Sequence, residues 1–141
     1  MKLTGLHRNA KIDLLRAVPL FGRCSGADLG RIAKLADELH VRDGRTLTVE
    51  GKPGREFFVL VEGSAEVRRK GRRVNVLGPG DFLGEIALVS DRPRTATVTT
   101  TSAATLLVLT GRDFRTLLRD VPAIQAKVLE AVAERLPAET V

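Results

Sequence analysis

The spacing of apolar residues changes twice along the chain and divides it into three parts. Apolar residues follow a helical spacing to about residue 37, alternate with polar residues over 38–110, and return to a helical spacing over 111–136. Short strands separated by glycine-rich turns, with helices at both ends, are typical of a β-roll or barrel flanked by helices. The pattern therefore predicts a mainly β fold with N-terminal helices at 9–37 and two C-terminal helices.

Two helices are predicted before the first strand. The first covers about 9–16 and ends before Pro19, because the residue preceding a proline disfavours helical dihedrals. Ser25 is a candidate N-cap for the second helix. Its predicted buried stripe comprises Leu29, Ile32, Ala33, Leu35 and Ala36.

The middle part reads as a series of strands. Residues 57–61 form a continuous apolar run, which indicates a strand buried on both faces. Residues 95–101 and 105–109 are rich in the β-branched residues that strands favour. The basic run at 68–73 falls where two strands meet in a hairpin, with Gly71 near the turn.

Two further helices are predicted after the strands. Thr110 is a candidate N-cap, and Asp113 would complete a capping box with it. Pro122 begins the last helix, which we expect to end near Leu136. Its apolar positions at helical spacing are Ile124, Val128, Leu129 and Val132.

Composition limits the classes of protein that fit. A chain of 141 residues is the size of one domain. No apolar run approaches the ~18–20 residues that cross a bilayer, and the first residues lack the apolar region of a secretory signal. A single cysteine, Cys24, fits a reducing compartment and is expected to be a small structural residue. We therefore expect a cytoplasmic protein without a membrane partner.

The net charge of +6 raises the question of an anionic partner. The basic hairpin at 68–73 would suit a nucleic acid backbone, a membrane surface or an acidic protein, or be a solvated turn. None of the five phenylalanines lies in this run, so bases would find no stacking partner there. The solvated turn is the interpretation we favour.

The segment 84–98 contains the candidate chemistry. Gly84 permits close backbone approach, Glu85 would accept hydrogen bonds from a sugar hydroxyl, and Arg94 presents a planar fork suited to phosphate oxygens. An apolar turn after Glu85 would add free N–H groups for an anion. The alternative is a surface ion pair between Glu85 and Arg94, worth roughly 0–1 kcal/mol.

The wider sequence resembles a known family. Residues 78–88 followed by 92–98 are similar to the phosphate-binding cassette of the cyclic nucleotide-binding domain family. That family includes catabolite activator-type regulators, regulatory subunits of cAMP-dependent kinase and cyclic-nucleotide-gated channels. Residues 51–63 resemble its early strands and residues 14–21 its helical entry, so the resemblance extends from about Asp13 to Leu136.

The resemblance implies a fold, a ligand and residue roles. The fold would be a double-stranded, jelly-roll-like β-roll over 38–110 that contains the cassette, with two lid helices over 111–136, and the whole chain would be one domain. The ligand would be cAMP, with cGMP as the alternative. Glu85 would bind the ribose 2′-hydroxyl beside Leu83 and Gly84. Arg94 would bind the phosphate oxygens, aided by the backbone N–H groups of Ile86, Ala87 and Ala96.

Two further positions have open roles. In the family, a hydroxyl residue at the position of Thr95 donates to the phosphate or reaches a guanine edge; here it is either such a residue or simply a good strand former. Arg135, near the end of the lid, would stack on the purine or be a solvated charge near the helix carboxyl end. Leu129 and Val132 are apolar alternatives for covering the base.

The sequence thus predicts a stand-alone cyclic nucleotide receptor that acts through lid-helix movement on a separate, unidentified protein. It shows no DNA-binding domain, and apolar helix faces would permit a homodimer. The alternatives are an interaction module that no longer binds nucleotide, and the sensor portion of a longer regulator. We expect no enzyme, metal or cofactor, because only two histidines are present and no catalytic triad pattern is found.

Overall fold

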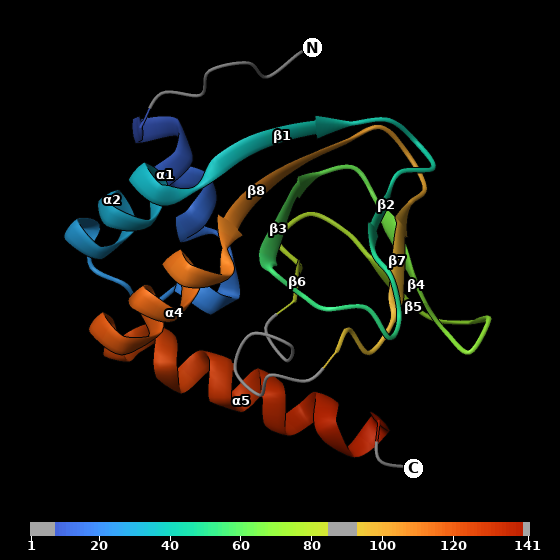
Figure 1. Cartoon of the computed structure of the whole chain (residues 1–141). Helices are drawn as coiled ribbons and strands as arrows, with labels where there is room; N and C mark the ends of the chain where they lie inside the picture. Colours follow the sequence, from blue (N-terminus) through green and yellow to red (C-terminus); the bar gives the residue numbers. More distant parts are fainter. Residues whose placement is uncertain (1–7, 85–92, 140–141) are drawn as a thin grey trace.

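The computed structural model describes residues 8–84 and 93–139, and within them two antiparallel sheets of four strands face each other (Figure 1). The first sheet has the order β1 (Asp37–Val41), β8 (Ala104–Thr110), β3 (Glu56–Glu62) and β6 (Phe82–Leu83). The second has the order β2 (Thr46–Thr48), β7 (Thr97–Thr100), β4 (Ala65–Arg69) and β5 (Arg72–Leu77). The predicted mainly β fold with flanking helices is confirmed.

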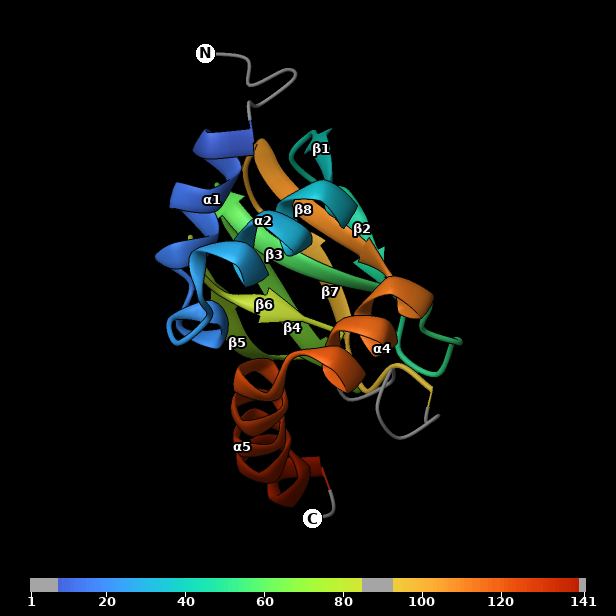
Figure 2. The same cartoon turned by 90° about the vertical axis from the view of Figure 1, so that its left-hand side faces the viewer.

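The helices gather at one side of the first sheet, and α5 extends away from it (Figures 1 and 2). They are α1 (Arg8–Arg16), the 3-10 turn η1 (Pro19–Phe21), α2 (Gly26–Leu35), α4 (Gly111–Asp120) and α5 (Pro122–Glu139). The predicted break before Pro19 is confirmed, whereas α5 continues beyond the predicted end at Leu136. In the described part of the chain, no helix is long and apolar enough to cross a membrane.

Strand β3 is buried on both faces, as its continuous apolar run predicts. Alternate side chains of a strand point to opposite faces. Phe57 and Val59 therefore pack against the helices, whereas Phe58 and Leu60 point into the space between the two sheets. Strand β8 divides its side chains in the same way, so the first sheet separates two apolar cores.

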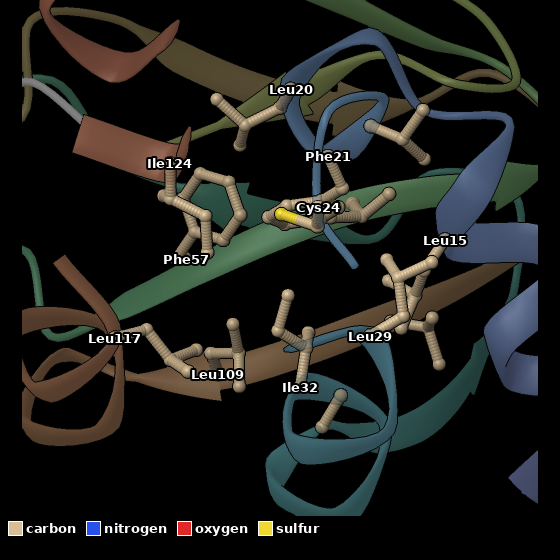
Figure 3. Packing of buried hydrophobic residues seen from close by; sticks show 14 of the residues in the cluster. Leu15, Leu20, Phe21, Cys24, Leu29, Ile32, Phe57, Leu109, Leu117 and Ile124 are labelled. Carbon is tan, nitrogen blue, oxygen red and sulfur yellow. The ribbon is translucent and has the colours of Figure 1, made fainter. Parts of the chain in front are cut away.

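The core beneath the helices joins the N-terminal helices to α5 (Figure 3). Phe57 stacks on Phe114 of α4 with ring centroids 4.4 Å apart. Phe21 of η1 and Ile124 of α5 are both buried in this cluster. Cys24 lies among them, and burial raises the pKa of its thiol to about 11, with a smaller contribution from Asp28. This confirms the structural role expected for Cys24, since a protonated buried thiol is inert.

Side-chain caps fix the starts of α2 and α4. The Ser25 Oγ atom accepts a bond from Asp28 N at 3.1 Å, and the Asp28 carboxylate accepts one from Ser25 N at 3.2 Å. These two bonds form a complete capping box. At α4, Thr110 Oγ1 accepts from Asp113 N at 3.1 Å, but the expected box is incomplete, because the cap hydrogen bond of this helix runs only from Asp113 to Thr110. Thr110 is therefore a simple N-cap.

The basic hairpin, residues 68–73, lies at the predicted place between β4 and β5. Its two turn residues, Lys70 and Gly71, have φ values of 52° and 77°. Positive φ at both central residues is the signature of a type I′ turn, which suits the twist of the two strands. Lys70 is the one residue other than glycine with positive φ in the described ranges.

Replacing this lysine with asparagine is expected to stabilise the domain. An ordinary L-residue in the left-handed region costs roughly 1–2 kcal/mol, and asparagine tolerates it better. Lys70→Asn creates the Asn-Gly pair that type I′ turns favour, so we expect the free energy of unfolding to rise by about 0.5 kcal/mol. Urea denaturation of the two proteins measures the difference, and a lower midpoint for the variant would contradict the argument.

Candidate functional site

The backbone of Arg94 is fixed against the turn that follows β2. Arg94 N donates to Lys52 O, and Gly51 N donates to Arg94 O, both at 2.8 Å. These bonds extend the antiparallel pairing of β2 with β7, in which Thr48 lies opposite Val98. The pairing of these two segments therefore determines the position of the Arg94 backbone, from which its side chain extends.

The side chain of Arg94 is also held in place. Only 7% of the residue is exposed, and its Nη2 atom donates to the carbonyl oxygen of Glu56 at 2.7 Å. Its Nη1 atom is buried as well. A buried guanidinium in a fixed orientation is a strong, directional group for an anion with paired oxygens.

Gly84 makes this packing possible. Its φ is +104°, a conformation that other residues rarely adopt. A Cβ atom on Gly84 would lie 2.6 Å from Arg94 Nη1 and 2.6 Å from Glu56 O. The structure shows a close approach of the Arg94 guanidinium to Gly84, and the predicted approach of a ligand to this glycine stays a prediction.

The residues after Arg94 are held by strands β4 and β2 and by the turn that follows β2. Arg69 Nε, on β4, donates to Thr95 O at 3.2 Å. Thr48 Oγ1, on β2, donates to Ala96 O at 3.0 Å in a buried bond. Glu50 N donates to Thr97 Oγ1 at 3.0 Å. Hydrogen bonds thus hold segment 94–97 along its whole length.

The structure brings together five of the predicted site residues. Leu83 ends β6 and is buried, Gly84 follows it against Arg94, and Thr95 and Ala96 lead from Arg94 into β7. The proximity agrees with a shared site, and the assigned contacts to a ligand remain predictions.

The other predicted residues cannot be placed in the same way. Glu85, Ile86 and Ala87 lie outside the described residues. Arg135 belongs to α5, and its side chain lies outside the described side chains. Their predicted roles therefore remain predictions.

Sequence reasoning did not find the groups that hold Arg94. Glu56 contributes a backbone carbonyl, which leaves no signature in a sequence. Lys52 also contributes a carbonyl, although the glycine-rich turn at 51–54 does mark an unusual backbone there. The sequence indicates Arg69 only as part of a basic turn, because its contact with Thr95 spans 26 residues.

The junction of α4 and α5 is connected to the N-terminal helices. Arg31 of α2 forms an ion pair of 2.8 Å with Asp120 at the end of α4. Hydrogen bonds from Arg31 and then Arg119 lower the pKa of the Asp120 carboxyl. Beyond the junction, Ile124 and Val128 are buried in the core, whereas Leu129 is 67% exposed. The first turns of α5 are anchored, and an apolar side chain on its other face is available for contacts.

The structure thus combines a β-roll that has helices against one sheet with a buried arginine packed against a glycine of positive φ. The sequence model described as "Cyclic nucleotide-binding domain" matches residues 38–121. The chain belongs to the cyclic nucleotide-binding domain family.

Similar proteins include channels and kinase regulators. A cyclic nucleotide-gated potassium channel of Mesorhizobium japonicum is 37% identical over 87% of this chain and 34% of its own length. A cAMP-dependent protein kinase regulatory subunit of Mycosarcoma maydis is 40% identical over 71% of this chain and 20% of its own. The chain spans about a third of the length of the first curated relatives it matches.

A solved structure has the same fold. The structure described as "Sp-2Cl-cAMPS bound to PKAR CBD2" superposes with a TM-score of 0.81 at 24% identity, covering 93% of this chain and 90% of that one. The agreement extends over nearly the whole of both chains. It confirms the double-stranded β-roll expected from the resemblance.

Proposed function

We propose that this domain is a receptor for cAMP and that Arg94 binds the exocyclic oxygens of the cyclic phosphate. The observation that carries the proposal is the fixed guanidinium: Arg94 is buried, bonded to Glu56 O at 2.7 Å and packed against Gly84. A cyclic phosphate presents two anionic oxygens, which match the fork of an arginine. Pre-positioned donors lower the cost of ordering the site on binding.

The relatives support cAMP as the nucleotide. One relative is described as cAMP-dependent and another as cyclic nucleotide-gated, at 40% and 37% identity. Thr95 then donates to the phosphate or contacts the base, Glu85 binds the ribose, and Arg135 covers the purine. We keep cGMP as the alternative ligand, because a hydroxyl at Thr95 is able to contact guanine.

The signal is proposed to pass through α4 and α5. Ligand binding moves these helices only if the closed arrangement binds the nucleotide better than the open one. The contacts that must change are those at the junction, which include the ion pair of Arg31 with Asp120 and the packing of Ile124. Such movement would reach the N-terminal helices and a separate protein that contacts them. We propose a regulatory, non-catalytic domain on this basis.

A second candidate is the same sensor acting inside a longer regulator. The channel and kinase relatives are longer than this chain, and it matches one part of each. In that case the partner of α5 is a segment of the same polypeptide. The ligand and its contacts are the same in both candidates.

Isothermal titration calorimetry tests the proposed ligand. We expect cAMP to bind with a Kd in the micromolar range or below and cGMP to bind more weakly. Linear 5′-AMP is the control, because its dianionic, open phosphate lacks the ring geometry of the cyclic ester. Absence of heat and of a thermal shift with either cyclic nucleotide would reject the receptor and favour the interaction module.

A further inference from the structure

We propose that Arg69 of β4 is a positioning residue for the ligand site. By holding the carbonyl of Thr95, it connects the basic hairpin to the segment that contains Arg94. It thereby sets the affinity for the nucleotide and the preference between cAMP and cGMP. This inference rests on the proposed function and adds a residue outside the phosphate-binding cassette at 78–98.

The position of Arg69 on β4 places it on the inner face of the roll. Side chains on one strand face recur at every second residue. Ala65 and Val67, which precede Arg69 at this spacing, pack in the core between the two sheets. Arg69 therefore continues an apolar row and ends it with a cation, while Arg68 points to the other face and is exposed.

The contact of Arg69 is directed at the residue next to Arg94. Its Nε atom donates to Thr95 O at 3.2 Å in a half-buried bond. A hydrogen bond from a charged donor is stronger than one between neutral groups. The Thr95 carbonyl belongs to the peptide between Thr95 and Ala96, so a shift of this peptide would move the Cα atom of Thr95, which is the direct neighbour of Arg94 in the chain.

A second contact from the hairpin reaches the other end of the same segment. Lys70 N donates to the carboxylate of Glu50 at 2.9 Å, and Glu50 N donates to Thr97 Oγ1 at 3.0 Å. The hairpin therefore contacts segment 94–97 directly at Thr95 and is connected to Thr97 through Glu50. The basic run, which the sequence indicates as a solvated turn, has one member that takes part in the site.

Two substitutions separate the hydrogen bond from the charge. Glutamine carries its amide nitrogen on Cδ, as arginine carries Nε, so Arg69→Gln retains a donor near the same place and removes the charge. Arg69→Met places a methyl group there and removes both. Arg73→Met removes one charge from an exposed position of the same hairpin and serves as the matched control.

We expect Arg69→Met to raise the Kd for cAMP about tenfold, the typical effect of one charge-assisted hydrogen bond. Arg69→Gln is expected to recover most of that loss, to within about threefold of the unsubstituted protein. The ratio of the Kd values for cGMP and cAMP should change in the methionine variant, because Thr95 is displaced. Arg73→Met should leave both values unchanged. Calorimetry well below each unfolding midpoint provides these values.

Amide hydrogen exchange in the nucleotide-free protein tests the same inference without a ligand. Arg69→Met is expected to speed exchange of the Arg94 and Gly51 amides, which pair the two segments, whereas Arg73→Met is not. Equal affinities, an unchanged nucleotide ratio and equal exchange in Arg69→Met would overturn the inference. If Arg69→Gln and Arg69→Met both lose affinity for cAMP and Arg69→Lys does not, the effect comes from the charge and not from the hydrogen bond. That result would also overturn the inference. Failure of the unsubstituted protein to bind either nucleotide would instead reject the proposed function. Amide hydrogen exchange alone would then decide whether Arg69 positions the segment that contains Arg94.

Discussion

Arg94→Ala is expected to raise the Kd for cAMP by a factor between about 30 and several thousand, because losing one partner of a desolvated charge pair costs roughly 2–5 kcal/mol. Hydrogen bonds of both the backbone and the side chain of Arg94 fix this guanidinium in the described structure. Calorimetric titration measures the change. A Kd within threefold of the unsubstituted protein would remove the phosphate role of Arg94.

The same substitution also affects folding, so a matched variant is needed. Alanine removes the donor to Glu56 O, and we expect a loss of about 1 kcal/mol in the free energy of unfolding. Arg94→Lys keeps the positive charge but not the planar fork. We therefore expect it to bind more tightly than alanine and less tightly than arginine. Equal binding by lysine and arginine would show that charge alone suffices.

Gly84→Ala is expected to lower both stability and affinity. The residue has a φ of +104°, and its Cβ atom would lie 2.6 Å from both Arg94 Nη1 and Glu56 O. Backbone strain and overpacking together should cost about 2–4 kcal/mol of stability. The arginine must move to accommodate the methyl group, so we expect affinity for cAMP to fall at least tenfold, as for any loss above about 1.4 kcal/mol.

Gly63→Ala is the control for strain without displacement of the arginine. Gly63 has a φ of +95°, and its Cβ atom would lie 2.5 Å from Ala103 O. It follows β3 at the end opposite Glu56, roughly 20 Å away at the usual rise of a strand. We expect a similar fall in the urea midpoint with an unchanged Kd. If both variants lose affinity equally, general destabilisation explains the effect and the specific role of Gly84 fails.

The fold was predictable because its signals are local. Each signal determines structure within a few residues. These signals are the helical spacing before residue 37 and after residue 110, the prolines Pro19 and Pro122, and the cap at Ser25. The apolar run at 57–61 predicts a strand buried on both faces, since no polar residues alternate within it, and the burial of β3 confirms this. The errors are local too: α5 passes Leu136, and the box at Thr110 is incomplete.

The candidate site was only partly predictable because it depends on long-range register. Arg94 was identified from its chemistry and its motif. Its anchors are carbonyl groups of Lys52 and Glu56, which any residue would supply equally well. The contact from Arg69 depends on how β4 pairs with β7, where Arg68 lies opposite Thr97. Such pairing is a property of the assembled sheet, and no spacing in the sequence encodes it.

The single thiol of the chain lies in the core that α5 shares with the N-terminal helices. Because Cys24 is buried and only the thiolate reacts, we expect a thiol reagent to label it mainly when that core opens. Native-state labelling kinetics at this residue therefore report how often the helices separate from the first sheet. Cys24 is therefore a natural labelling site for this opening, and no cysteine needs to be introduced.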